Sequence, residues 1–380
     1  WDLMASGAWG CDDDSPELPC HMGAWSKAML GWVDVVTLDP DTDHGNLILP
    51  PVETGGHVYR VDTQDGSGEY FLLENRQPVG FFDRNLHGGG GLVVWQVDPV
   101  RVAARWAANT VNGSDRPGVR LRQADGRGDL LRSGGGRGDA GDPFPGSTGN
   151  DMFHAGSDPA AVSYEGTATG ITIHDIQASS LAGADASFDL TTRLTRVTLV
   201  AEGSTGAEPI FTVDGASPQP SRGTFAAAPF SRSRLEAAAG ESREAGVRWP
   251  FQRWEDVEIS RVRTLDVPLV DVTLNAVYSE REIQLGVTLD SDAGAIVPAV
   301  VASAPSSPDL WFAEGQDVEV RVEPRTGFAF TAWTGDLDGA SNPAFLTMTR
   351  PVFAGATLTS VYAVPGATFD ATAAVAQSLT

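Results

Sequence analysis

The residues of this chain that could bind a catalytic metal are first of all its histidines, and their spacing is informative. A zinc-binding helix of the H-E-x-x-H type needs two histidines four residues apart and a glutamate that activates the metal-bound water. No histidine here has a second one at that spacing, since the six stand at positions 21, 44, 57, 87, 154 and 174. Neither a G-x-x-x-x-G-K phosphate loop nor a G-x-S-x-G nucleophile elbow is present. Nucleotide-binding and serine-hydrolase functions therefore have no motif to support them.

The two cysteines, Cys11 and Cys20, flank a polar loop that is rich in turn-forming residues. A zinc site at these cysteines would need two more ligands with matching spacing. We therefore predict a Cys11–Cys20 disulfide that closes the loop in an oxidising compartment. The alternative is a pair of reduced, buried thiols.

Three carboxylates alternate along one loop, at Asp39, Asp41 and Asp43, and Gly45 follows them. Hard, oxygen-preferring ions such as calcium are bound by loops of this kind. The glycine stands one position later than in an EF-hand, and position 12 of such a loop would be Pro50 rather than a glutamate. Calcium is the candidate ion for the three aspartates, and a solvated acidic turn is the alternative.

The composition of the chain argues against some classes of binding partner. The chain has 50 acidic and 26 basic residues and a net charge of -24, which argues against nucleic acid or an anionic membrane as a partner. No stretch approaches 18 uninterrupted apolar residues, so we expect no transmembrane helix in these 380 residues. A chain of this length can form roughly two to four domains, each with its own core.

The elements that must position these residues begin with one helix. Helical periodicity is clearest over residues 23–32, where Trp25, Ala28, Met29 and Trp32 recur at helical spacing. We predict that these four side chains face a core.

Strand signals follow from residue 46 to 190, where apolar runs alternate with turns rich in Gly and Asp. The predicted strands are 47–49, 57–61, 70–74, 92–97 and 171–176. Residues 132–157 are so rich in Gly, Asp and Pro that we predict a long loop, shaped by turns or ions rather than by a core. The region is expected to be an antiparallel β-rich module.

The second half contains an internal repeat. The sequence F-Q-R-W at 251–254 is echoed by F-T-A-W at 330–333. Each is followed by a predicted strand pair, ending in Val-Tyr at 277–278 and at 361–362 respectively. We expect the tryptophan of each echo to lie in the core of its copy; these are Trp254 and Trp333.

The second copy carries the pattern G-F-x-F-x-x-W-x-G-D at 327–336, followed by Asn342 and Pro343. This pattern resembles the internalin-type B-repeat, a small β-grasp-like module of bacterial surface and secreted proteins. The first copy lacks the Gly-Asp pair after its tryptophan and is the more divergent of the two.

Five separated blocks in the first half resemble, in the same order, the immune inhibitor A family of secreted zinc metallopeptidases. They include W-D-L-M-A-S-G near the start, G-E-Y-F-L-L-E-N-R-Q, G-L-V-V-W-Q-V-D and G-D-A-G-D-P-F-P-G. The blocks are residues 1–10 with 19–27 and 30–33, then 68–77, 91–98, 123–126 and 138–146. The match begins just downstream of the family's zinc-binding helix, so the resemblance implies a peptidase fragment whose zinc ligands lie before Trp1.

The resemblance also implies roles for single residues. Met4 stands where the wider metzincin group places a methionine on a tight turn beneath the metal, and an ordinary core methionine is the alternative. His21 matches a histidine of the family's Pro-x-His element, beside the cleft or packed at the helix end. The family usually has a histidine directly after Trp95, whereas this chain has Gln96, which argues against essential chemistry there.

Together these observations predict a mainly β, multidomain protein with five parts. Residues 1–45 would complete an α/β metzincin-like catalytic domain, 46–192 would form a sandwich-like β module, 195–281 and 282–364 two β-grasp-like repeats, and 365–380 a linker or truncated module.

The expected function is that of a fragment of a secreted bacterial metalloendopeptidase, which acts on protein or peptide substrates and is inactive alone. The alternative is a non-catalytic secreted or cell-surface binding protein, which would use its repeats to contact a surface or matrix.

Overall fold

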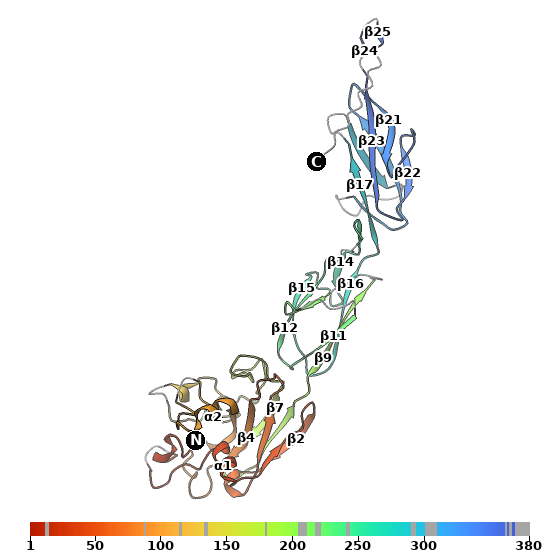
Figure 1. Cartoon of the computed structure of the whole chain (residues 1–380). Helices are drawn as coiled ribbons and strands as arrows, with labels where there is room; N and C mark the ends of the chain where they lie inside the picture. Colours follow the sequence, from red (N-terminus) through yellow and green to blue (C-terminus); the bar gives the residue numbers. More distant parts are fainter. Residues whose placement is uncertain are drawn as a thin grey trace. The chain divides into compact units, whose positions relative to one another are not determined.

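In the computed structural model, whose helices and strands are drawn in Figure 1, the chain comprises two compact units. The first comprises Trp1–Val197, Phe225–Ser233 and Thr264–Val272, and the second comprises Thr198–Thr224, Arg234–Arg263 and Thr273–Thr380. Strands dominate both units, so the predicted mainly β class is confirmed. The residues described are 1–11, 15–86, 89–113, 116–132, 136–178, 181–203, 211–216, 222–240, 244–289, 294–300, 310–361, 363–364 and 367–368.

The elements of the first unit alternate short helices with strands. They are η1 (Ser6–Trp9), α1 (Ala24–Leu30), β1 (Val35–Thr37), β2 (Asp43–Leu49), η2 (Val52–Thr54), β3 (Val58–Asp62), β4 (Tyr70–Arg76), β5 (Gly91–Val97), α2 (Pro99–Trp106), β6 (Val119–Arg122), η4 (Asp129–Leu131), β7 (Thr172–Ala178) and β8 (Ala186–Thr191). Among the residues that the structure describes, no helix is long and apolar enough to cross a membrane.

A five-stranded sheet with the order β1-β3-β4-β5-β6 is the centre of this unit. Its middle strands β4 and β5 are buried along almost their whole length. Strands covered on both faces read as continuous apolar runs, as L-V-V-W in β5 does. The sheet therefore separates two cores, one on each face.

The first core lies between this sheet and a three-stranded sheet, β2-β8-β7, so a two-sheet arrangement is present. The loop predicted at 132–157 contributes to the core, because Phe144 and Phe153 are fully buried and bridge to Leu92 and Ile173. The described part of the loop is thus anchored by apolar side chains as well as shaped by turns, which corrects the sequence-based expectation.

The second core lies on the other face and joins residues 1–45 to the β module. Trp1, Cys11, Cys20 and Ala24 share it with residues of β3, β4, β5 and β6. Strand β2 also runs across the predicted boundary at residues 45 and 46. Residues 1–192 consequently lie in one unit rather than in two separate ones.

Helix α1 forms close to the predicted place but presents a different face to the core. Its buried residues are Ala24, Ser26 and Lys27, whereas Met29 and Trp32 are 57% and 66% exposed. The prediction is confirmed for Trp25, which packs against the second core, and is wrong for Met29 and Trp32. The buried side of the helix also contains Lys27, which meets a buried carboxylate.

The second unit consists almost entirely of strands. They are β9 (Thr195–Glu202), β10 (Phe211–Val213), β11 (Arg222–Ala227), β12 (Arg232–Ala237), β13 (Val247–Arg248), β14 (Phe251–Trp254), β15 (Val262–Asp266), β16 (Val272–Tyr278), β17 (Glu282–Thr288), β18 (Gly294–Val300), β19 (Trp311–Ala313), β20 (Asp317–Pro324), β21 (Phe328–Gly335), β22 (Ala344–Thr347), β23 (Val352–Ser360), β24 (Ala363–Val364) and β25 (Ala367–Thr368). Some of them include short segments assigned to the first unit.

The two predicted repeat copies share one strand topology. In the first copy the sheets are β11-β9-β16-β14 and β10-β12-β15, and in the second copy they are β13-β17-β23-β21, with β19 also on β17, and β18-β20-β22. Successive strands alternate between the sheets in the same order in both copies. Each copy is therefore built from two sheets, which replaces the expected β-grasp-like module.

The strand register supports the repeat and corrects its alignment. A bulge interrupts β14 between Phe251 and Arg253, and a bulge at the same place interrupts β21 between Phe330 and Ala332. Phe251 pairs with Tyr278, whereas Phe330 pairs with Leu358.

The structural equivalent of Val-Tyr at 277–278 is therefore Thr-Leu at 357–358, not the predicted pair at 361–362. Strand β13 lies within the first predicted copy, 195–281, but pairs with β17 of the second copy. This pairing crosses the predicted boundary between residues 281 and 282. Of the predicted linker 365–380, the structure describes only residues 367–368.

Candidate functional site

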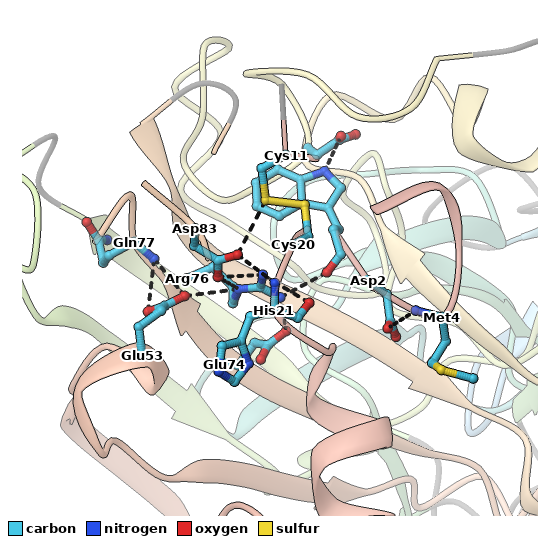
Figure 2. Close-up of a disulfide and its surroundings, with 12 residues drawn as sticks. Asp2, Met4, Cys11, Cys20, His21, Glu53, Glu74, Arg76, Gln77 and Asp83 are labelled. Atoms are coloured by element: carbon cyan, nitrogen blue, oxygen red, sulfur yellow. Dashed lines mark hydrogen bonds and ion pairs between the residues drawn. A yellow bond between two sulfur atoms is a disulfide. The ribbon is translucent and has the colours of Figure 1, made fainter. Parts of the chain in front are cut away.

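The N-terminal segment is held against the sheet by a buried polar cluster (Figure 2). Cys11 and Cys20 are joined by a disulfide, and both are 3% exposed. The Cys11 sulfur lies 3.3 Å from Oδ1 of Asp83, which also accepts a 2.8 Å hydrogen bond from the backbone N–H of His21. The disulfide therefore sits directly beside a buried carboxylate. Positions 12–14 of its loop lie outside the described residues.

Arg76, at the end of β4, is the centre of this cluster and is fully buried. Its guanidinium donates to Glu53 at 3.0 Å, to Asp83 at 2.6 Å and to the backbone oxygen of Trp1 at 2.9 Å. Burial alone would lower the pKa of Arg76, but the carboxylates of Asp83, Glu74 and Glu53 outweigh it and raise the pKa. The arginine thus remains charged and ties the start of the chain to the sheet.

Lys27 of α1 binds the same cluster through Glu74. Its Nζ lies 3.4 Å from Oε2 of Glu74, and the two side chains are 1% and 0% exposed. Trp95 donates from Nε1 to the other oxygen of Glu74 at 2.7 Å. Burial would raise the pKa of Glu74, but Lys27 and Arg76 outweigh it and lower the pKa, so this carboxylate is held in its charged form.

Glu53 is the third carboxylate of the cluster, with a side chain that is 3% exposed. Burial raises its pKa to about 8, and a hydrogen bond with Asp83 contributes to the rise. Three carboxylates and two cations leave one negative charge without a partner, and such a group takes up a proton when buried. Glu53 is the carboxylate that takes up this proton, because Arg76 and hydrogen bonds to Asp83 outweigh burial and hold the pKa of Asp83 below its ordinary value.

Trp1 connects the remaining matched blocks to the cluster. Its Nε1 donates to Oδ2 of Asp142 at 2.6 Å, and Gln123 donates to Oδ1 of the same carboxylate at 2.5 Å. Burial raises the pKa of Asp142 despite these hydrogen bonds. All five sequence blocks that carry the family resemblance thus meet in one buried network around Trp1, Glu74 and Arg76.

Met4 lies on a tight turn and is 73% exposed. The backbone N–H of Ala5 donates to the backbone oxygen of Asp2 at 3.0 Å, and that of Met4 donates to the Asp2 carboxylate at 2.9 Å. Met4 lines a cavity of about 320 Å³ together with Trp1 and Trp25, among other residues. In this chain it is therefore a cavity-wall residue and not a core methionine.

His21 does not line that cavity. Its ring makes an edge contact with Phe82, with 5.9 Å between ring centroids, and Nδ1 is buried without a hydrogen-bond partner among the described residues. Burial and the nearby Lys27 and Arg76 lower its pKa. The position matches the alternative of a histidine packed near the start of α1.

The described residues do not form a zinc site suited to a peptidase. One group of potential ligands is Cys11, Cys20 and Asp83, but the two sulfurs are bonded to each other and offer no thiolate. The other group is His174, Asp175 and Asp189, which contains a single histidine. Because neither supplies the two histidines of a zinc helix, no catalytic step through zinc is assigned to this chain.

The aspartates predicted to bind calcium do not converge. They are absent from the groups of three ligands whose atoms lie within 4.8 Å of one another in the described part of the chain. Strand β2 begins at Asp43, whose carboxylate accepts a hydrogen bond from Thr191 and lies 3.3 Å from Nε of Arg193. Since Asp43 belongs to a strand and is paired, Asp39 and Asp41 are left in a separate turn.

The repeat tryptophans are core residues with equivalent hydrogen bonds. Trp254 is 0% and Trp333 is 4% exposed. Nε1 of Trp254 donates to the backbone oxygen of Ser260 at 3.0 Å, and Nε1 of Trp333 donates to that of Ser341 at 2.8 Å. Each indole thus closes the loop that follows its own strand.

Sequence reasoning missed the charged residues of the cluster, Lys27, Glu53, Arg76 and Asp83. One signal was available: Glu74 and Arg76 directly continue an apolar strand whose neighbours are apolar on both faces. A charged residue in such a strand must be paired inside the protein. The partners themselves come from distant loops, which the pattern does not identify.

Comparison of the chain with protein-family models, with curated proteins and with solved structures found no match.

Proposed function

We propose that this chain is part of a secreted zinc-dependent metalloendopeptidase of the immune inhibitor A type, and that residues 1–192 support its catalytic cleft. The single observation that carries the proposal is the convergence of the five family-like blocks in one buried network. If the five resemblances had arisen independently by chance, nothing would require the blocks to contact one another. Blocks that together form one structure are expected to be in contact.

The contacts of this network support a shared structural role. Trp1 of the first block binds Arg76 of the second and Asp142 of the last, and Trp95 of the third block binds Glu74 of the second. Buried charged groups need partners of this kind in defined positions. The matched residues thereby fix the N-terminal segment, with Met4 on its turn beside the 320 Å³ cavity.

Location and activity follow from the same proposal. A disulfide that closes a short loop is typical of extracellular proteins, which supports secretion. The 380 residues contain no H-E-x-x-H helix, so the zinc that the family uses would be held by residues outside this chain. Protein or peptide substrates are therefore proposed for the whole enzyme and not for this chain alone.

A non-catalytic binding or adhesion protein is the second candidate. The observation in its favour is the pair of β modules with the same topology in the latter half of the chain. Repeated modules of this type commonly act as spacers or contact surfaces, and they would do so with or without an active peptidase.

The reading frame upstream of the codon for Trp1 distinguishes the two candidates. An intact H-E-x-x-H motif and an acidic third ligand would support the peptidase, whereas substituted ligands would support the binding protein. The chain as given should release no peptides from casein in the presence of zinc. Cleavage by these 380 residues that a chelator abolishes would refute the proposal.

A further inference from the structure

Two arginines of β6 converge on one uncharged oxygen. Arg120 and Arg122 lie on the same face of the strand. Arg120 donates to Oε1 of Gln96 from Nε at 2.9 Å and from Nη2 at 2.6 Å, and Arg122 donates to the same oxygen from Nη1 at 3.1 Å. Two like charges are thus held together by an amide that cannot neutralise either of them.

Neither arginine forms an ion pair with a carboxylate of the described residues within 4.0 Å. Arg122 also donates from Nη2 to the backbone oxygen of Ala160 at 2.5 Å, and the guanidinium of Arg120 lies 4.1 Å from the centroid of the Tyr164 ring. This is unexpected in a chain with 50 acidic and 26 basic residues. Burial lowers the pKa of Arg122 to about 10, so its guanidinium still carries a charge at neutral pH.

The amide of Gln96 is fixed by a carboxylate behind it. Its Nε2 donates to Glu69 at 2.5 Å and to the backbone oxygen of Val162 at 3.1 Å, and Glu69 is 3% exposed. Because both amide donors are occupied, Oε1 must face the arginines. Glu69 attracts both arginines, and Asp158 attracts Arg122, but neither carboxylate forms an ion pair with them.

A cavity of about 190 Å³ adjoins the two arginines. Its wall includes Arg120, Arg122, Gln123 and Asp158 and the glycines at 126 and 128. Asp158 is the only carboxylate of the lining. It attracts Arg122 electrostatically without forming an ion pair with it. We name this space the arginine cavity.

We propose that the arginine cavity binds an oxyanion, a carboxylate or a phosphate group, through Arg120 and Arg122. Guanidinium groups bind both kinds of anion through paired, charge-assisted hydrogen bonds. A bound oxyanion would place a negative charge in direct contact with the two guanidinium groups, which no described carboxylate does. Although Gln96 and Gln123 lie in two of the matched blocks, anion binding is argued from the arginine contacts alone, so failure of the peptidase proposal would not overturn it.

The test is binding of inorganic phosphate and of acetate to the full chain at pH 7.5, measured by calorimetry at constant ionic strength set with sodium chloride. At least one of the two anions should bind saturably. Phosphate alone would identify a tetrahedral ligand, and acetate alone a carboxylate. Absence of saturable binding for both would overturn the proposal.

Variants locate the site. Arg122→Gln should weaken binding at least about tenfold, since a charge-assisted hydrogen bond is lost. Arg116→Gln is the matched control, because Arg116 stacks on the same Tyr164 ring but is paired with Glu165 and Asp98; its binding should not change. If Arg122→Gln does not fold, Arg122→Lys retains the charge and should weaken binding through loss of the planar fork. Unchanged binding in the folded Arg122 variant would refute the assignment.

Discussion

The buried acid pair predicts an unusual pH dependence of stability, which the substitution Glu53→Gln can isolate. The pKa of Glu53 in the folded protein is about 8, against an ordinary value of 4.5. Folding therefore favours the protonated form. The contribution of this group to stability is fully present below pH 4.5 and is lost as the pH rises through 8.

The magnitude follows from the width of that window. Each unit by which the two pKa values differ corresponds to about 1.4 kcal/mol, so the loss between pH 4.5 and 8 has a ceiling of about 5 kcal/mol. A glutamine has the shape of the protonated acid and can donate to Asp83 while it accepts from Arg76. The variant should lack this loss, and relative to the wild type it should gain several kcal/mol between pH 5 and 9.

The assay must report on the first unit alone. Both proteins are equilibrated in urea at pH 5, 7 and 9 and then exposed briefly to deuterated water. Mass spectrometry of peptides from β4 and β5 gives the fraction of that unit unfolded. The difference in unfolding free energy between variant and wild type should increase from pH 5 to pH 8 and then level off.

Glu74→Gln is the matched control, because Glu74 belongs to the same cluster but has a lowered pKa. Its charged form is favoured by folding, so its contribution is present above the ordinary pKa and is lost only in acid. The control should destabilise the unit by about 3–5 kcal/mol at pH 7 and also at pH 5, where Glu53→Gln should have little effect. Parallel pH profiles for Glu53→Gln and wild type would refute the protonation of Glu53 in the folded protein.

Three further predictions concern residues that stabilise each unit from within. Replacing both Cys11 and Cys20 with serine should destabilise the first unit by about 2–3 kcal/mol through loop entropy, and a reducing agent should affect only the wild type in urea unfolding. Arg76→Met should lower the free energy of unfolding by about 3–5 kcal/mol, because it leaves buried carboxylates unpaired. Arg60→Met, at an exposed pair with Asp62, should lower it by less than about 1 kcal/mol. Equal urea midpoints for the two variants would contradict this prediction. Trp333→Ala should destabilise its repeat copy by about 3–5 kcal/mol, measured by hydrogen exchange in β21 and β23, while Trp32→Ala at a 66% exposed site should have little effect.

The sequence by itself determined the features that depend on local pattern. Continuous apolar runs gave the buried strands β4 and β5, and the paired F-x-x-W sequences gave two copies of one module with core tryptophans. The turn-rich loop between Cys11 and Cys20, together with the lack of two further zinc ligands at matching spacing, favoured the disulfide over reduced thiols. These features are readable because periodicity and spacing act over a few residues.

Tertiary structure alone decided which charged residues meet and what covers each face. The apolar pattern of α1 did not identify Lys27 as a buried residue. Glu53, Arg76 and Asp83 come from three separate segments. The convergence of Arg120 and Arg122 on Gln96 likewise depends on the pairing of β5 with β6. Contacts of this kind follow from packing between distant segments, where the need to pair a buried charge selects the partner.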